Sequence, residues 1–163
     1  MSASLQVSIR RFEPADWPQL WLLLRATFEA GYTYAYAPDS PEADIRRIWT
    51  EAPAATFVAC GPDQQVIGTY LIKANQPGLG SHVCNCGYVV APAAQGRGIA
   101  AALCEHSQRE AVAMGFRAMQ FNLVVSTNER AVRLWQRLGF AVVGTLPRAF
   151  HHRQLGYVDA RVF

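Results

Sequence analysis

The chain has 163 residues, a length that fits one domain of ordinary size and leaves little room for a second. Hydrophobic residues make up 51% and charged residues 17%, which provides a sizeable core and excludes intrinsic disorder as the main state. The formal net charge of +3 is too small for the concentrated basic face of a typical nucleic-acid-binding protein. We therefore expect one domain over residues 1–163 and no nucleic-acid partner.

The N-terminal residues contain no apolar signal segment, and no run of about 18 apolar residues occurs anywhere. These observations predict a cytoplasmic protein without a membrane span. The chain has four cysteines. In a strand, Cys84 and Cys86 would share a face with His82, an arrangement that could hold a metal ion. Structural zinc, however, prefers two pairs of ligands with wider spacing. We expect buried, reduced cysteines and no metal.

The first quarter of the chain predicts one strand and two helices. Apolar and polar residues alternate over 5–12, which favours a strand. A helix follows over 16–30, with Asp16 as its N-cap. An aromatic loop over 32–40 then leads to a second, short helix over 41–51.

The remainder alternates strands with helices. Two strands are expected at 55–60 and 65–74, and a buried central strand at 82–91. A glycine-rich turn then opens a helix over 98–114. Further along the chain the pattern predicts strand, helix, strand and strand, at 117–125, 128–138, 141–146 and 155–163. This interleaving is typical of an α/β sandwich with a mixed sheet.

The turn between the central strand and the helix carries the most specific chemical signal. A strand that runs through a glycine-rich loop into a helix directs several backbone N–H groups and the positive end of the helix dipole at one point. A phosphate or pyrophosphate is the natural ligand there. The nucleoside-triphosphate loop is excluded because its Lys-Ser/Thr is absent, and Ala101 replaces the last glycine of the dinucleotide fingerprint. On these residues alone, a plain glycine-rich turn remains the alternative.

Two motifs at a fixed spacing resemble those of the GNAT superfamily of acyl-CoA-dependent N-acyltransferases. The first is Gln-x-x-Gly-x-Ala over 95–100, which Val90-Ala91-Pro92 precedes. The second is Asn-x-x-Ala over 128–131, which Leu134-Trp135 and Gly139-Phe140 follow. The order of predicted elements also matches, so the resemblance covers almost the whole chain. The tail over 144–159 is similar to the branch that acetylates phosphinothricin and methionine sulfoximine.

The resemblance implies a mixed, mostly antiparallel sheet that splays at its central strands, with helices on both faces. It also implies acetyl-CoA as the acyl donor and no metal. The pantetheine arm would bind the strand backbone at Val89, Val90 and Ala91, with the Val90 N–H polarising the thioester carbonyl. Asn128 would contact the arm or cap its own helix, and Arg130 would reach the phosphates. The pyrophosphate would lie on Gln95, Gly96, Arg97, Gly98, Ile99, Ala100 and Ala101.

The groups that move protons depart from the family pattern. Where the family often has a carboxylate base on the central strand, this chain has Asn85, which can only orient a water or the amine. His82 and Glu29 are the alternative bases. Trp135 stands where a tyrosine usually protonates the departing thiolate, and indole does not release its proton. Either the thiolate leaves unaided or with the help of water, or another group such as Tyr88 protonates it.

The acceptor site would lie near the aromatic loop, which in this family walls the acceptor pocket. Tyr32 and Tyr34 would surround an amine by cation–π contact, with simple packing as the alternative. His152, in the last connection between strands, would meet a carboxylate of the acceptor. The implied reaction is acetyl transfer from acetyl-CoA to a primary amine of a small molecule, an amino acid or its analogue. The alternatives are acetylation of a protein or peptide N-terminus, and a non-catalytic acyl-CoA-binding module; the resemblance also implies a homodimer.

Overall fold

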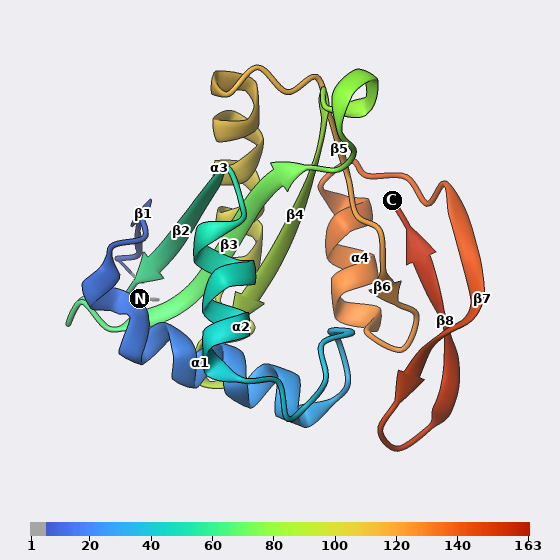
Figure 1. Cartoon of the computed structure of the whole chain (residues 1–163), viewed down its shortest axis with the longest axis horizontal. Helices are drawn as coiled ribbons and strands as arrows, with labels where there is room; N and C mark the ends of the chain where they lie inside the picture. The colour runs from blue at the N-terminus through green and yellow to red at the C-terminus, as the bar shows by residue number, and fades with distance from the viewer. Residues whose placement is uncertain (1–5) are drawn as a thin grey trace, which may run out of the picture. The chain divides into compact units, whose positions relative to one another are not determined.

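The computed structural model describes residues 6–163, and these fall into two compact units (Figure 1). The first unit contains the described residues up to Leu24 together with Pro41–Met119, and the second contains Arg25–Ser40 and Gln120–Phe163. Helix α1 (Trp17–Ala30) contributes residues to both units. The expectation of a single domain stays a prediction.

A five-stranded sheet in the order β1-β2-β3-β4-β5 forms the frame of the first unit. The pairs β1–β2, β2–β3 and β3–β4 are antiparallel, so the sheet is mostly antiparallel, as expected. β2 is buried along its whole length, because both faces of the sheet are covered. The strands are β1 (Ser8–Arg11), β2 (Ala55–Cys60), β3 (Val66–Ala74), β4 (Val83–Val90) and β5 (Ala118–Gln120).

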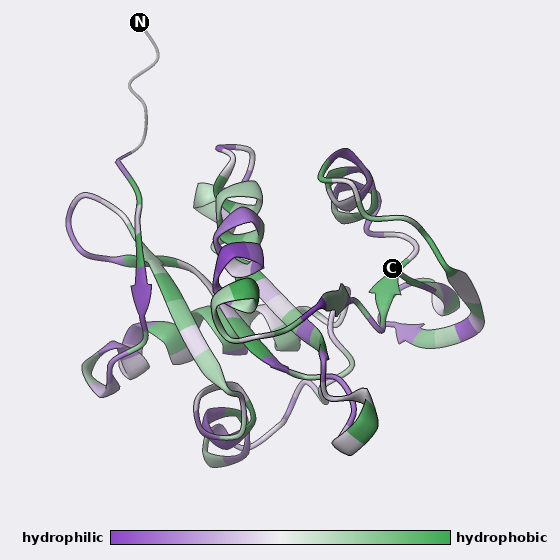
Figure 2. Cartoon of the chain, turned by 90° about the horizontal axis from the view of Figure 1, so that it is seen from above, coloured by the Kyte–Doolittle hydropathy of each residue, from purple (hydrophilic) through white to green (hydrophobic). Residues whose placement is uncertain are grey.

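Helices cover both faces of this sheet (Figure 2). On one face α3 (Ile99–Ala113) packs against β3 and β4, and its His106 Nδ1 lies 2.8 Å from the Tyr70 hydroxyl of β3. On the other face lie α2 (Glu42–Arg46) and the π-helical turn η2 that continues it. From that turn the fully buried Trp49 donates its indole N–H to Thr69 Oγ1 at 3.1 Å. The expected two-faced architecture is confirmed.

The second unit is built on a three-stranded sheet in the order β6-β8-β7. Its strands are β6 (Val124–Val125), β7 (Gly144–His152) and β8 (Gly156–Val162), and its helix is α4 (Glu129–Arg137). The apolar side of α4 places Trp135 against Phe121 and Phe140, with ring centroids of Phe121 4.9 and 4.6 Å from those of the other two. Trp135 is 7% exposed and is a core residue of this unit.

One expected strand is divided between the two sheets. The sequence predicts a single strand over 117–125, but β5 pairs with β4 and β6 pairs with β8. The chain therefore leaves the first sheet after Gln120, because its two halves find hydrogen-bond partners in different sheets. The divergence of the central strands that the family resemblance implies stays a prediction.

Two further expectations about local structure are wrong. Asp16 is not the N-cap of α1 but lies in the 3-10 turn η1 (Pro14–Asp16), where it accepts a hydrogen bond from the Glu13 N–H. Its carboxylate is held by Arg10 at 2.8 Å, and this guanidinium lowers the pKa of Asp16. His152 belongs to β7 rather than to the connection after it, because its register with Gly156 extends the hairpin.

Candidate active site

The open edge of β4 is fixed by its register with β3. Ala91 donates its N–H to Ile67 O at 2.8 Å, and Val83 O accepts from the Asn75 N–H at 2.8 Å. Since hydrogen-bonding direction alternates along a strand, the odd-numbered residues of β4 bond to β3. The backbone of Tyr88 and Val90 therefore faces the opposite edge. Of the three expected backbone donors, Val90 is the one whose N–H is directed there; Val89 and Ala91 use theirs within the sheet.

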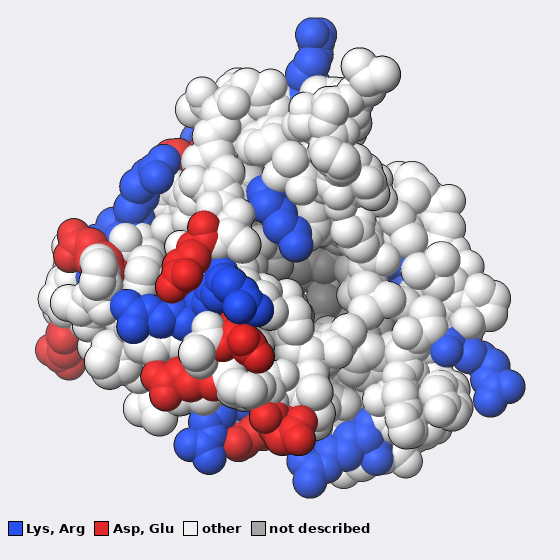
Figure 3. Space-filling model, viewed as in Figure 1, with Lys and Arg blue, Asp and Glu red and all other residues white. Residues whose placement is uncertain are grey.

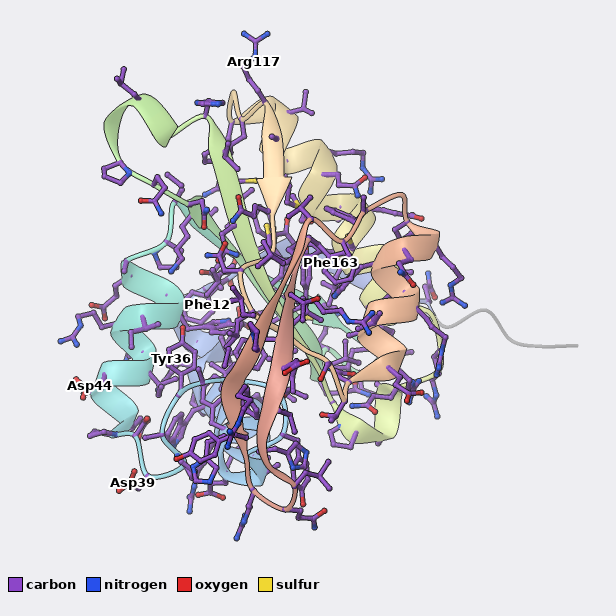
Figure 4. The ribbon with its side chains drawn as sticks, turned by 90° about the vertical axis from the view of Figure 1, so that its right-hand side faces the viewer. Phe12, Tyr36, Asp39, Asp44, Arg117 and Phe163 are labelled. Carbon is purple, nitrogen blue, oxygen red and sulfur yellow. The ribbon has the colours of Figure 1, made fainter. Side chains whose placement is uncertain are left out.

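The neighbouring strand β5 is too short to cover that edge. It is three residues long, and it begins level with the start of β4, where the Arg117 N–H donates to His82 O at 2.8 Å. Arg117 lies at this end of the sheet, far along β4 from the loop that opens α3 (Figures 1 and 4). The second half of β4 thus extends beyond β5, so its edge can accept an extended ligand as if it were another strand.

The loop after β4 forms a concentrated set of backbone donors. The 3-10 turn η4 (Pro92–Ala94) leads to Gly96 and Gly98, whose φ angles are +78° and +80°. Gly98 is the N-cap of α3 and supplies no side chain to cap it. The first helical bond runs from the Ala102 N–H to Gly98 O, so the preceding amides of Ile99, Ala100 and Ala101 have no acceptor within the helix. This arrangement suits an anion, as the sequence predicts.

Gly68 of β3 holds the start of α3 close to the sheet, a contribution that the sequence analysis missed. A Cβ built at Gly68 would meet Leu103 Cδ1 at 3.1 Å and Ile99 Cγ2 at 3.4 Å. Both of those helix residues are buried. A side chain at Gly68 would therefore press on these two side chains and require them to shift by a few tenths of an ångström. The available signal was a glycine inside a strand, which often marks a close approach of another element.

Two residues expected to contact the cofactor belong to the second unit: Asn128, expected at the pantetheine arm, and Arg130, expected at the phosphates. Asn128 is the N-cap of α4, and its Oδ1 accepts from the Ala131 N–H at 3.3 Å. The capping role considered from the sequence is thus confirmed, and contact with the cofactor remains a prediction for both residues. Gln95 and Arg97 of the loop are exposed, and the Gln95 Nε2 lies 3.5 Å from Val90 O.

The candidate bases differ in their distance from the open edge. Asn85 is half-buried in β4, pairs with Lys73 of β3, and lies on the face opposite the side chain of Tyr88. His82 is exposed and lies in the turn before β4, so the expectation that it belongs to the strand is wrong. It precedes Val90 by eight positions, which is roughly 26 Å along an extended strand. This separation favours Asn85 over His82.

Replacing His82 by alanine therefore tests the choice between these two residues. A positioned general base contributes about 10²- to 10⁴-fold to a rate. Because His82 is exposed and far from the open edge, we expect His82→Ala to retain the wild-type dependence of kcat/KM on pH and to lose less than about tenfold in rate. Steady-state kinetics at saturating acyl donor between pH 6 and pH 9 measure this. A larger loss with folding and donor affinity intact would restore His82 as the base.

Tyr88 is poorly suited to protonate a thiolate. Its hydroxyl lies 2.7 Å from Ser107 Oγ of α3 and 3.6 Å from Met119 Sδ, on the α3 side of the sheet. Burial raises the pKa of Tyr88 well above its ordinary value, so the phenol holds its proton more tightly than usual. The expectation that Tyr88 acts as the acid is not supported by this environment, and its side chain is a packing and hydrogen-bonding residue.

The residues expected around the acceptor are in the second unit, and the structure brings two of them together. Tyr32 stacks on His152 with ring centroids 4.9 Å apart. Tyr34 and Tyr36 pack edge-on against Phe28, at 5.4 and 4.9 Å, which agrees with the packing alternative for Tyr34. Burial also raises the pKa of Tyr36.

Glu29, the third candidate base, forms an exposed ion pair. Its carboxylate lies 2.7 Å from Arg25 Nε one helical turn earlier in α1. Deprotonating an ammonium group requires a base that can reach the nitrogen. Within residues 6–163, the contact of the Glu29 carboxylate is this pair with Arg25, which does not direct it at a substrate.

Cysteines, metals and surface charge add little to the site. All four cysteines are free and buried, and residues 6–163 contain no group of three His, Cys, Asp or Glu side chains able to hold a metal. On the face seen in Figure 3, acidic side chains lie among basic ones on the left of the view, and the charged side chains on the right are basic. None of the helices formed by the described residues has the length and apolar composition that crossing a membrane requires.

Comparisons with known proteins agree with this geometry. The sequence pattern of the acetyltransferase (GNAT) family matches residues 17–140. The chain is 38% identical over 99 residues to N-acetyltransferase aca1 of Schizosaccharomyces pombe, a match covering 60% of this chain and 47% of that protein. The chain thus spans about half the length of this curated relative.

Solved structures with the same fold include two informative ones. A GCN5-related N-acetyltransferase from Kribbella flavida is 45% identical, with a TM-score of 0.90 over 96% of this chain and 95% of that one. A GNAT superfamily phosphinothricin acetyltransferase from Sinorhizobium meliloti, solved in complex with AcCoA, has a TM-score of 0.86 at 20% identity, over 97% and 86% of the two chains. The strand edge, the glycine-rich helix start and the sequence pattern all lead to one assignment: the chain belongs to the acetyltransferase (GNAT) family.

Proposed function

We propose that this chain transfers an acetyl group from acetyl-CoA to the primary amine of a small molecule. The observation that carries the proposal is the continuity between the open edge of β4 and the anion-binding start of α3. An extended ligand with a pyrophosphate at one end fits such a surface. The acetyl-CoA bound by the Sinorhizobium meliloti neighbour supports the same donor.

The direction in which the donor lies along β4 determines which part of the donor the backbone N–H groups of Tyr88 and Val90 would bind. With the pyrophosphate on the loop over 96–101, the pantetheine arm runs back along β4, and the thioester lies at its far end. Val90, nearer the loop, would then bind an amide of the arm, and the Tyr88 N–H would polarise the thioester carbonyl. This differs from the sequence-based expectation, which gave the carbonyl to Val90. A donor at that place stabilises the oxyanion that develops in the transition state.

The reaction proceeds by direct attack. An amine with a pKa near 10.4 must first lose a proton, which costs roughly 4–5 kcal/mol at neutral pH. A water that we place beside the half-buried Asn85 would relay that proton to bulk solvent. The free amine then attacks the thioester carbon, the C–S bond breaks, the CoA thiolate leaves with the electron pair, and the nitrogen releases a second proton to solvent as the amide forms. A thiol pKa of about 8.5 allows the thiolate to leave and be protonated by water, without a tyrosine acid.

The proposed class of acceptor rests on the net charge of the second unit. The second unit contains seven arginines and four acidic residues, so it carries the whole positive excess of the chain. This favours an acceptor with a carboxylate beside its amine, such as an amino acid.

The free, buried cysteines are compatible with a reducing cytoplasm. A homodimer stays a prediction.

Release of CoA thiol tests the proposal. Acetyl-CoA is supplied with amino acids, polyamines and short peptides, and acetylated products are identified by mass so that the protein's own thiols do not interfere. We expect transfer to amino acids and weak or no transfer to peptides. Transfer to peptides alone would replace the small-molecule acceptor with a protein N-terminus. Binding of acetyl-CoA without any transfer would make the chain a non-catalytic binder.

A further inference from the structure

The two faces of β4 differ in what covers them. Side chains at its even-numbered positions point toward α3: Cys84 and Cys86 are buried there, and the Tyr88 hydroxyl forms a hydrogen bond with that helix. The odd-numbered positions point to the opposite face. An amine that attacks a thioester at the Tyr88 N–H therefore has to approach from the odd-numbered face, because α3 packs against the other one.

Gly87 leaves the odd-numbered face without a side chain beside that N–H. A glycine in the interior of a strand weakens the strand and often marks the close approach of a ligand. The backbone does not require glycine here, because Gly87 has the extended conformation of β4 and not a positive φ. Its pairing partner on β3 is the buried Leu71. The half-buried Gly87 thus offers room for a group that lies against the strand.

Lys73 brings a positive charge to this part of the sheet. It is the single lysine of the chain and the first exposed residue of β3, which is buried from Val66 to Ile72. Its pairing partner on β4 is Asn85, whose side chain carries no charge. Within residues 6–163, no acidic side chain forms an ion pair with Lys73. Its ammonium group is therefore left for an anion from outside the protein.

The strand register places this charge next to Gly87. Lys73 pairs with Asn85, two positions before Gly87, so Lys73 and Gly87 are diagonal neighbours on one face of the antiparallel pair. Such neighbours are about 7–8 Å apart, a distance that a long side chain spans. In an amino acid the carboxylate is attached to the carbon that carries the amine. An amine held over Gly87 thus brings its carboxylate within reach of Lys73.

We propose that the odd-numbered face of β4 at Gly87 binds the acceptor amine, and that the Lys73 ammonium holds a carboxylate on the neighbouring carbon. This inference rests on the proposed function and names the residues that select amino acids over simple amines. Both residues belong to the first unit and to strands that pair directly, one of them the strand whose open edge we assign to the donor.

Substitutions of Lys73 separate its charge from its shape. Lys73→Met removes the ammonium but keeps an unbranched side chain, Lys73→Arg keeps a cation, and Lys73→Glu reverses the charge. Arg109→Met is the matched control, because it removes one positive charge from an exposed position on α3, on the other side of the sheet.

The probes are pairs that differ only by a carboxylate: L-leucine with 3-methylbutylamine, and L-phenylalanine with 2-phenylethylamine. At saturating acetyl-CoA, Lys73→Met should lower kcat/KM for the amino acids by about 5- to 50-fold, mainly through KM, without lowering it for the amines. Lys73→Arg should retain most of the preference, and Lys73→Glu should make the amine the better acceptor of each pair. Arg109→Met should behave as the wild type, and the affinity for acetyl-CoA should be unchanged in all four variants.

Gly87→Ala tests the space at the strand separately from the charge. Its methyl group should lower kcat/KM by at least about tenfold for both members of each pair, because it occupies the place of the amine. The affinity for CoA should stay the same, since the methyl points away from the open edge. Unchanged kcat/KM, or a lower free energy of unfolding, would show that Gly87 serves packing and would overturn the acceptor site.

The single lysine also permits a test that does not depend on turnover. Reductive methylation with carbon-13 formaldehyde labels Lys73 and the N-terminal amine and keeps their charge. Lys73→Arg identifies the Lys73 signal in the NMR spectrum. With CoA bound, L-leucine should shift this signal and 3-methylbutylamine should not.

The outcomes distinguish this inference from the proposed function. Equal shifts of the Lys73 signal by the two ligands, or equal losses for amino acids and amines in Lys73→Met, would overturn the role of Lys73 while acetyl transfer stands. Absence of transfer from the wild type to any probe would overturn the proposed function and this inference with it.

Discussion

Val90→Pro should lower kcat/KM for acetyl-CoA by about 100-fold or more while the protein remains folded. Proline removes the N–H that faces the open edge of β4, and its ring occupies the space beside that edge. An unsatisfied buried acceptor costs about 1–3 kcal/mol, and the steric effect adds to this. The fold should survive because proline is tolerated where the N–H is not used in the sheet, and here Ala91, not Val90, donates to β3.

Val90→Ala is the matched control, since it shortens the side chain but keeps the N–H. We expect it to retain most of the activity. Binding of CoA without the acetyl group separates two roles for the amide. If Val90 holds the pantetheine arm, CoA affinity falls in Val90→Pro together with kcat/KM; if CoA affinity is unchanged and kcat alone falls, Val90 polarises the carbonyl. Wild-type kinetics in a folded Val90→Pro variant would show that the edge does not bind the donor.

Gly98→Val should weaken acetyl-CoA binding by at least about tenfold. Gly98 has a φ of +80°, a conformation that costs a residue with a Cβ about 1–2 kcal/mol. A Cβ there would meet no atom of the described protein within 4 Å, so the new side chain would extend into the space that we assign to the phosphates. Isothermal titration with acetyl-CoA measures the loss.

Gly115→Val controls for backbone strain. Gly115 follows the other end of α3, has a φ of +87°, and is equally open, with no atom within 4 Å of a built Cβ. The two variants should therefore lose similar free energy of unfolding, and only Gly98→Val should lose affinity. Equal affinities in the two variants would contradict a pyrophosphate site at the start of α3.

The sequence predicted the conformation of the glycine-rich loop well because local rules determine it. A glycine-rich turn between a buried strand and a helix has few backbone solutions, and both Gly96 and Gly98 adopt the left-handed conformation that such a turn requires. The two-faced sheet likewise followed from the alternation of strands and helices.

The catalytic and acceptor side was harder to predict because it depends on register and on contacts distant in sequence. β4 begins at Val83, which leaves His82 outside the strand. Hydrogen-bonding direction alternates from residue to residue, so the register with β3 determines that the Val90 N–H, and not that of Ala91, faces the open edge. The contact of Tyr32 with His152 joins residues 120 positions apart, and no local pattern indicates it. The close approach at Gly68 depends in the same way on the packing of α3.

The chain leaves the first sheet after Gln120, so β5 is short and does not cover the edge of the second half of β4. Exposed strand edges are templates for pairing with other chains, and proteins normally protect them. Here the donor itself would serve as the protecting strand. A molecule that binds only the folded form at a hundred times its dissociation constant stabilises that form by about 2.7 kcal/mol. A bound donor would then stabilise the folded chain as well as serve as its substrate.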